Sequence, residues 1–498
     1  MNVNPITRLD YPDPDVIRVE DTYYMVSTTM HFMPGCEILQ SFDLVHWEHV
    51  TYVYETLDHT DAQQLKSGQN IYGQGMWAAS LRYHEGRFCI CFVANDTRKT
   101  YLYTSEKIDG PWKKQLIEGF YHDASLLFDE DGRNYIVYGN DEIWITELNE
   151  DLTAPKKGGL HRLLVSDHKN PELGYEGSHI QKINGYYYIF LIHSLRDRWM
   201  RTEACFYSDS LEGEFTGGDV LCDDRGYCGQ GVAQGGIVDT PDGKWYAMLF
   251  QDSGAVGRIP ILVPVTWKDH FPVFGQNGHV PEEIEVHSTR PGYIYQPLVG
   301  SDDFCNGLLP RWQFNHDPDP RYYHLDALQG TYTITTREVC TELTQAVNTL
   351  TQRMSYPSCA AEVTVDASAL KEGDVAGLCA LQSCYAAVGI TKHHGKYEVL
   401  MLDKKEDGIL DMTERTVVES HQMDFRLEAD FCNMKDEARC YYRVNKGDWL
   451  PIGTVHKLYF KLDHFTGCRF GLFCYAAEET GGSACFRDFK YYDVDEIS

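Results

Sequence analysis

A short pattern of turn residues followed by an aromatic-rich alternating strand occurs five times in the first 300 residues. A short apolar strand precedes each turn, so each copy is expected to form a β-hairpin. The copies are 65, 46, 53 and 58 residues apart, and each interval can hold a four-stranded sheet. Repeats at this spacing are typical of a β-propeller. We therefore predict five blades over residues 1–295, with the first strand of each hairpin innermost. The copies are EDTYYMVST, EGRFCICFV, DGRNYIVYG, NGYYYIFLI and DGKWYAMLF, aligned on Tyr24, Cys89, Tyr135, Tyr188 and Tyr246.

The repeat ends before residue 301, and a different pattern runs from there to residue 498. Short alternating segments such as YTITT, CAAEVTV and YEVLML are separated by turn signals such as HHGK, NKGD and EETGGS. Strands without helical periodicity predict an antiparallel β-sandwich as a second domain over residues 301–498. The chain is thus expected to be all-β. The pattern leaves open whether the sandwich has any role beyond stabilising the propeller or building a homo-oligomer.

The composition excludes several classes of partner. Lys and Arg number 44 against 74 Asp and Glu, which gives a formal net charge of −30. This charge repels phosphate backbones and anionic lipids, so neither nucleic acid nor a membrane is an expected partner. The first residues lack a secretory pattern, and no apolar run approaches the roughly 18 residues of a membrane span. The sixteen cysteines are scattered singly, and Cys89 and Cys91 are interpreted as small apolar residues on one sheet face. Reduced thiols favour a cytoplasmic location.

Equivalent positions upstream of the five aligned residues carry side chains that can take part in catalysis or binding. The position lies eleven residues before Tyr24 and twelve before the other four aligned residues. In a propeller these positions sit where the innermost strands begin, around one mouth of the central channel. The five side chains are therefore expected to face one pocket: Asp13, Trp77, Asp123, Glu176 and Gln234.

Three carboxyl groups and an indole in one pocket suit the hydrolysis of glycosidic bonds. One carboxylic acid protonates the leaving oxygen, while a carboxylate activates water or attacks the anomeric carbon. A third acid can raise the pKa of the first and orient it. The indole of Trp77 can cover the apolar face of a sugar ring, although tryptophans also pack between blades.

Five ordered segments carry a resemblance to a known family. They are similar to glycoside hydrolase family 43, the five-bladed propeller hydrolases of xylan and arabinan side chains. The resemblance implies that Asp13 is the general base, Asp123 the pKa modulator and Glu176 the general acid. It also implies that Arg258 holds substrate hydroxyls and that the configuration of the anomeric carbon is inverted. Inversion requires roughly 6.5–9.5 Å between the acid and the base. The segments are YPDPDVIRVEDTYYMVST, GMWAASLRYHEGRF, HDASLLFDEDGRNY, YEGSHIQKINGYYY and QDSGAVGRIPILVPVTWKDHFPVFG.

Two further residues, Phe32 and His122, match positions that line the terminal sugar pocket in relatives, with core packing as the alternative for each. The C-terminal domain resembles the concanavalin-like domain of xylosidase-type members. In those enzymes a loop of this domain often walls the active pocket, but the sequence does not indicate which loop does so here.

The sequence departs from the family pattern at two places. Many members have a histidine that binds calcium where this chain has Gln234. Glutamine can offer calcium an amide oxygen but no imidazole, so the sequence leaves open whether a structural calcium ion is bound in the channel. No cofactor is expected to be required. Ile-Pro follows Arg258 in place of the Glu-Thr-His of the xylosidase branch, which puts a pure xylosidase in doubt.

The leading hypothesis is an inverting exo-acting glycosidase that removes terminal α-L-arabinofuranosyl and/or β-D-xylosyl units from small neutral oligosaccharides derived from plant hemicellulose. A non-hydrolytic, lectin-like sugar-binding propeller is the alternative from another class, and the presence of all three acids disfavours it. A retaining propeller enzyme that acts on fructosides is a third alternative, but the expected WMNDPNG-type start is absent.

Overall fold

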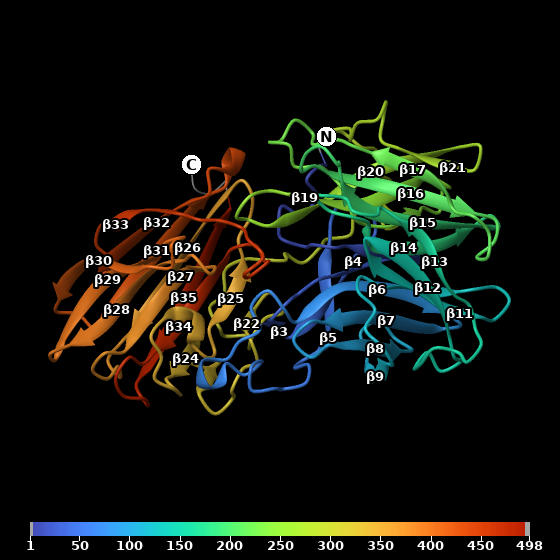
Figure 1. The fold of residues 1–498 in the computed structure, drawn as a ribbon. Helices are drawn as coiled ribbons and strands as arrows, with labels where there is room; N and C mark the ends of the chain where they lie inside the picture. The colour runs from blue at the N-terminus through green and yellow to red at the C-terminus, as the bar shows by residue number, and fades with distance from the viewer. Residues whose placement is uncertain (1–2, 494–498) are drawn as a thin grey trace.

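A computed structural model describes residues 3–493, and the part that it describes is built almost entirely of β-strands. Five antiparallel four-stranded sheets form the predicted propeller, and two larger sheets form the sandwich beside it (Figure 1). The blades are β1 (Asp15–Val19), β2 (Thr22–Ser27), β4 (Gly35–Ser41) and β5 (Glu48–Tyr54); β6 (Met76–His84), β7 (Arg87–Ala94), β8 (Lys99–Ser105) and β9 (Lys113–Ile117); β10 (Ser125–Phe128), β11 (Asn134–Asn140), β12 (Glu142–Leu148) and β13 (His161–Ser166); β14 (Glu176–Ile183), β15 (Tyr186–Ser194), β16 (Arg201–Ser208) and β17 (Thr216–Leu221); β18 (Ile237–Asp239), β19 (Trp245–Asp252), β20 (Arg258–Lys268) and β21 (Phe271–Phe274).

Each repeat copy forms the first hairpin of a blade, as predicted. Tyr24 lies opposite Ile17 and Cys89 lies opposite Arg82, so the aligned residues occupy the second strand of their blades. The first strands of neighbouring blades contact one another, which confirms that they are innermost. The second strands of the blades are buried along almost their whole length, as in β7 and β15, because neighbouring blades cover both of their faces.

Hydrophobic clusters between neighbouring blades hold the ring together. Cys89 and Cys91 are buried in the cluster between the second and third blades, as small apolar residues. Between the last and first blades, Tyr246 and Leu262 pack with Tyr23 in one cluster. Among the described residues no strand is exchanged between the first and last sheets. Burial of apolar area at the blade junctions closes the ring, together with backbone hydrogen bonds from Ile6 and Tyr11 to β20.

The sandwich consists of an eight-stranded and a seven-stranded sheet packed over one large apolar cluster. Three single-turn 3-10 helices complete the described elements: η1 (Lys66–Gly68), η2 (Leu343–Gln345) and η3 (Cys432–Met434). The first sheet runs β3 (Phe32–Met33), β22 (Gln313–Asn315), β25 (Leu350–Arg353), β34 (Arg469–Tyr475), β27 (Val375–Leu381), β28 (Ala386–His393), β29 (Lys396–Lys404) and β30 (Leu410–Val418); the second runs β23 (Tyr323–Asp326), β24 (Thr331–Thr335), β35 (Ser483–Asp493), β26 (Ser358–Asp366), β31 (Gln422–Asp430), β32 (Glu437–Val444) and β33 (Leu450–Lys457).

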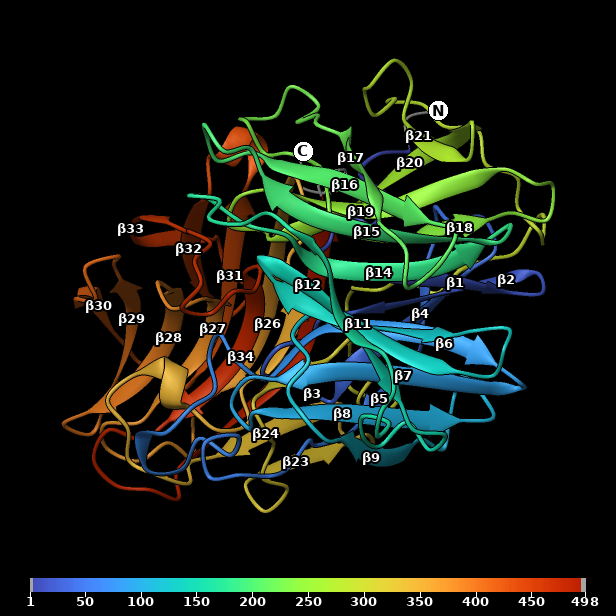
Figure 2. The ribbon, with the colours of Figure 1, turned by 45° about the vertical axis from the view of Figure 1, so that its right-hand side comes forward.

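A strand from the propeller chain extends the sandwich. β3 lies between two strands of the first blade, yet it pairs with β22 at the edge of the eight-stranded sheet. Figure 2 shows the segment around β3 crossing from the propeller to the sandwich. The segment 275–312, between β21 and β22, contains the predicted domain boundary and packs back on the first blade, where Tyr295 Oη accepts a hydrogen bond from the Phe42 amide. No described helix is long and apolar enough to cross a membrane.

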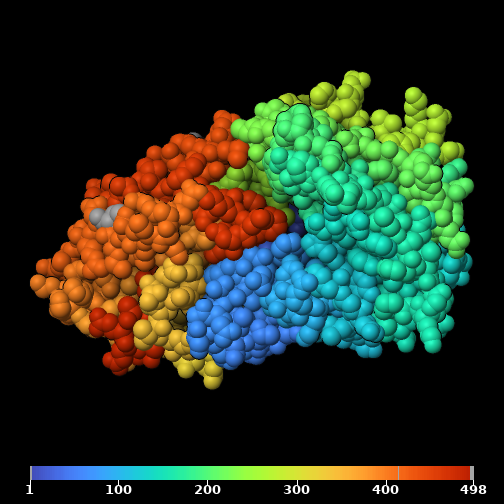
Figure 3. Space-filling view, in the orientation of Figure 1, coloured from blue at the N-terminus to red at the C-terminus, as the bar shows by residue number. Residues whose placement is uncertain are grey.

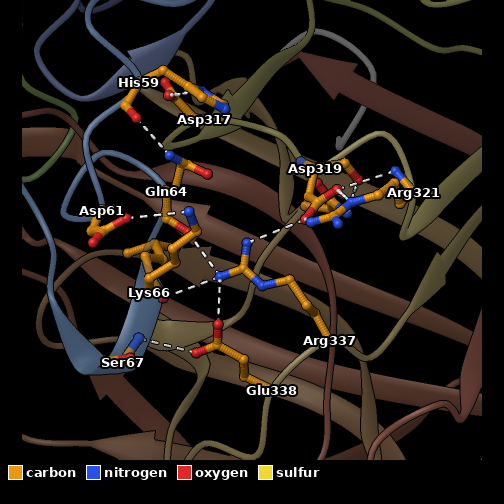
Figure 4. Close-up of polar contacts among 12 residues, drawn as sticks. His59, Asp61, Gln64, Lys66, Ser67, Asp317, Asp319, Arg321, Arg337 and Glu338 are labelled. Atoms are coloured by element: carbon orange, nitrogen blue, oxygen red, sulfur yellow. Dashed lines mark hydrogen bonds and ion pairs between the residues drawn. The ribbon is translucent and has the colours of Figure 1, made fainter.

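A polar network joins the loop between the first two blades to the sandwich (Figure 4). Arg337 of the sandwich donates to the carbonyl oxygen of Gln64 at 2.9 Å, and Glu338 accepts from the amide of Ser67 at 3.1 Å. His59 and the buried Asp317 form a further pair across the interface at 2.7 Å. These contacts hold the loop between the first two blades against the sandwich.

Asp10 ties the two domains together beneath the candidate site. Its carboxylate, in a residue only 4% exposed, accepts hydrogen bonds from the amide of Arg258 and from the amide of Gly467, both at 2.8 Å. Its carbonyl oxygen accepts from Arg353 Nε at 2.9 Å. One buried residue therefore bonds β20 of the propeller and two segments of the sandwich.

Replacement of Asp10 tests how much this clamp stabilises the molecule. In Asp10→Ala two buried amides lose their acceptor, so the free energy of unfolding should fall by about 2–4 kcal/mol. Asp326 is a matched control because it also accepts from two backbone amides, but in an exposed turn. Asp326→Ala should change the free energy by less than about 1 kcal/mol in urea titrations. Equal losses in the two variants would contradict the clamp.

Candidate active site

The five equivalent residues lie where the innermost strands begin, in two backbone arrangements. Asp13, Asp123 and Gln234 precede their strands and have left-handed backbone angles, with φ of 52°, 47° and 62°. Trp77 and Glu176 lie within the first two residues of their strands, where the register shifts. Left-handed residues other than glycine are uncommon and cluster at functional sites.

Asp13 is buried and held from two sides. Thr28 Oγ1 donates to its Oδ2 at 2.6 Å, and Arg258 Nη1 donates to its Oδ1 at 3.0 Å. Asp13 and Arg258 are only 6% and 2% exposed, so the pair is shielded from solvent. A positive charge at this distance stabilises a negative charge in a poorly solvated pocket. The two contacts also fix the orientation of the carboxyl group.

Asp123 and Glu176 meet at His122. The Nε2 atom of His122 lies 3.5 Å from Asp123 Oδ2 and 3.4 Å from Glu176 Oε2. The amide of Gly177 donates to Asp123 Oδ2 at 3.1 Å, and Asn140 Nδ2 donates to Glu176 Oε2 at 2.6 Å. The third and fourth blades therefore bring these two acids into one cluster.

The charges of the cluster shift two pKa values. Burial raises the pKa of Asp123 to about 6; the charge of His122 opposes this, and the charges of Glu176 and Asp13 add to it. Burial alone would lower the pKa of His122, but the charges of the three acids raise it to about 9. The negative charge of Asp13 thus contributes to the pKa shifts of both Asp123 and His122.

An aromatic wall completes the pocket. The partly buried Trp77 lies with its ring centroid 5.8 Å from that of His122 and 5.6 Å from that of Phe465, a sandwich residue. The guanidinium of Arg258 stacks 4.1 Å from the centre of the Phe465 ring. Figure 3 shows a hollow where the red loops of the sandwich meet the blue and green blades. The sandwich segment around Phe465 is the loop that the sequence did not indicate.

Gln234 lies beside a buried acid: its backbone amide donates to Glu203 Oε2 at 2.7 Å, and burial raises the pKa of Glu203 well above its usual value. The side chain of Gln234 packs against Gly177, where an added Cβ would lie 2.8 Å from Cδ. The guanidinium of Arg82 lies between the inner strands, 2.7 Å from Asp15 Oδ2 and within hydrogen-bond distance of carbonyl oxygens of the third and fourth blades. Both carboxylate oxygens of Asp15 are therefore already paired, one with Arg82 and the other with His179. His122, Asp123 and Glu176 each offer one ligand atom, and these atoms lie within 4.8 Å of one another, a spacing that an ion could bridge.

Phe32 is buried between the two domains. It belongs to β3, is 1% exposed, and packs in an apolar cluster made otherwise of sandwich residues. The guanidinium of Arg469 stacks 3.4 Å from the centre of its ring. The structure thus places Phe32 in the domain interface, the core-packing alternative, because β3 pairs with the sandwich and turns its side chain there.

Sequence reasoning missed four residues that shape the pocket: Asn140, Thr28, Phe465 and Arg82. Asn140 and Thr28 lie at or next to strand ends, where the repeat alignment gives no signal. Arg82 lies opposite Cys89 in the repeat, so its place on an innermost strand was readable, but its position inside the channel was not. Phe465 comes from the other domain, and nothing in the alternation of the sandwich strands singles it out.

Comparison with known proteins agrees with this architecture. The profile of the glycosyl hydrolases family 43 matches residues 3–272, and that of the beta xylosidase C-terminal concanavalin A-like domain matches residues 301–492. The chain belongs to glycosyl hydrolase family 43. It is therefore a glycoside hydrolase, and a lectin-like function is not favoured.

Relatives of this family 43 protein include xylosidases. A β-xylosidase of Formosa agariphila is 27% identical, with 99% of this chain and 89% of that protein aligned. A solved structure of an engineered family 43 enzyme with endo-xylanase and exo-arabinofuranosidase activity is 27% identical, with a TM-score of 0.87 over 99% of this chain and 100% of that one. A bifunctional GH43-CE protein of Bacteroides eggerthii is 43% identical, with a TM-score of 0.92 over 98% of this chain. This chain spans only 63% of that bifunctional protein.

A substitution at Gly177 tests how the backbone positions the acids. Gly177 has φ of 62°, and a methyl group there would collide with the buried Gln234 side chain. Because Gly177 follows Glu176 and binds Asp123, Gly177→Ala should lower kcat/KM by roughly tenfold or more.

The matched control is Gly185, which has φ of 85° in the next turn and open space around it. Gly185→Ala should reduce stability by about 1 kcal/mol through backbone strain and leave kcat/KM within about twofold. Similar kinetic losses in both variants would show that the contact with Gln234 does not matter.

Proposed function

We propose that this enzyme removes terminal α-L-arabinofuranosyl and/or β-D-xylosyl units from plant-derived oligosaccharides with inversion of configuration. The observation that carries the proposal is the convergence of Asp13, Asp123 and Glu176 in one pocket walled by Trp77 and Phe465. A wall contributed by a second domain suits a pocket that admits one terminal sugar. The names of the relatives support both sugars as candidates.

Each acid has a distinct part in the proposed reaction. Glu176 protonates the glycosidic oxygen, because its side chain is partly open to the pocket, with 20% exposed. Asp13 removes a proton from the attacking water, since Arg258 and Thr28 fix its carboxyl group from behind. Asp123 is closed off, and its negative charge and its place beside Glu176 make it the modulator.

The wider setting is also part of the proposal. The substrate is a small neutral oligosaccharide, and the reaction needs no metal or other cofactor. The enzyme works in the cytoplasm on imported short oligosaccharides. All sixteen cysteines are free thiols in the structure, which supports a reducing compartment. The sandwich, besides walling the pocket, offers surface for a homo-oligomer.

Leaving-group dependence separates the acid from the base. Glu176→Gln should lower kcat by roughly 10²–10⁴ on xylobiose or an arabinofuranosyl oligosaccharide, whose leaving alcohols need protonation. The loss should be much smaller on 4-nitrophenyl glycosides, because nitrophenolate leaves without a proton. Asp13→Asn should lower kcat about equally on both classes, since water must be activated in either case.

The control is Glu212→Gln, an exposed acid between β16 and β17 of the blade that carries Glu176. It should keep the wild-type rates. Full activity of both site variants, or no hydrolysis of any xyloside or arabinofuranoside by the wild type, would overturn the proposal.

The stereochemical course tests the role given to Asp13. Proton NMR of the first product from an aryl xyloside should show the anomer opposite to that of the substrate. Retention would mean that a carboxylate attacks carbon directly, which contradicts water activation by Asp13.

A further inference from the structure

His122 contacts two of the three acids without an assigned part in the chemistry. Its Nε2 atom is the ring atom that faces both Glu176 Oε2, at 3.4 Å, and Asp123 Oδ2, at 3.5 Å. The side chains of His122 and Glu176 are each 20% exposed, whereas that of Asp123 is 6% exposed. The contact between His122 and Glu176 therefore opens to the pocket, and the contact with Asp123 is closed.

We propose that His122 stores the proton that Glu176 delivers to the leaving oxygen, with one proton shared between Nε2 of His122 and Oε2 of Glu176. The proposal rests on the general-acid role of Glu176 given above. His122 acts through Glu176 and does not itself touch the glycosidic oxygen.

The charges around the ring explain why the proton stays. The titratable groups that act on His122 are Asp123 of the third blade, Glu176 of the fourth and Asp13 of the first, and together they raise its pKa to about 9. An ordinary glutamate has a pKa of about 4.3 and carries almost no proton at neutral pH. Since Nε2 of His122 lies within hydrogen-bond distance of Glu176 Oε2, His122 holds a proton next to that oxygen up to about pH 9.

The proton balance of one turnover follows. The proton leaves Nε2, crosses to Glu176 and passes to the glycosidic oxygen as the bond to the anomeric carbon breaks and its electron pair stays on that oxygen. Asp13 takes a proton from the water whose oxygen forms the new bond to carbon. Asp13 then releases its proton to solvent, and His122 recovers one from solvent, so the site returns to its starting state.

The pH dependence of kcat/KM tests the shared proton. In the wild type on a xylo- or arabino-oligosaccharide, the alkaline limb should lie near pH 9. In His122→Gln, which keeps a donor but cannot titrate, that limb should move down by at least one pH unit. Asn140 is the matched control, because it donates to the same oxygen of Glu176 and does not titrate. Asn140→Ala should lower kcat/KM at every pH without moving the limb.

An NMR titration tests the same proton without activity. The protein has twenty histidines, and the ring resonance missing from the His122→Gln spectrum identifies His122. Its titration midpoint should lie near pH 9 in the wild type and at least one unit lower in Glu176→Gln. An unchanged alkaline limb in His122→Gln, or a midpoint that ignores Glu176, overturns the shared proton. Absence of glycosidase activity in the wild type would instead overturn the proposed function and leave the titration as the test.

Discussion

The guanidinium of Arg258 is the contact on which the geometry of the pocket depends. It donates to Asp13 on one side and to the carbonyl oxygen of Phe465 on the other, while its face stacks on the Phe465 ring. Removing the acceptor of a buried arginine destabilises the fold, because an uncompensated charge in the interior is strongly unfavourable. The general-base candidate, the fifth blade and the sandwich wall are therefore fixed relative to one another by a single side chain.

The sequence predicted the propeller and the convergence of its acids because both follow from a local pattern. Turn residues and alternating strands repeat within about sixty residues, and equivalent positions in equivalent blades must meet. The one irregularity, eleven residues before Tyr24 in place of twelve, arises because the first blade has a two-residue turn and no register shift in its inner strand. The other blades have either a longer turn or a register shift, as in β10 and β14. Contacts between segments far apart in the chain leave no repeating pattern in the sequence. Asp10 with Gly467 and β3 with β22 join parts of the chain hundreds of residues apart, and a phenylalanine such as Phe32 has the same sequence signature beside a sugar or inside an interface.

The net charge of −30 and the charge of the site are separate matters. Within the pocket, Arg258 and His122, whose pKa the acids raise to about 9, offset part of the negative charge of the three acids. This balance is what allows adjacent carboxyl groups to hold different protonation states, as acid–base chemistry at one carbon requires. The surface acids keep polyanions away but leave a neutral sugar unaffected.

The strand β3 has a consequence for the order of events during synthesis. The blades precede the sandwich in the chain, and the apolar cluster between the last and first blades can close the ring before the sandwich exists. Until β22 is made, however, Phe32 and its strand have no partner, and the acids face solvent without Phe465 above them. An unpaired apolar edge of this kind invites association with other chains. The sandwich is therefore the last part to form. Its strand β22 covers the unpaired edge of β3, and its residue Phe465 completes the wall of the pocket.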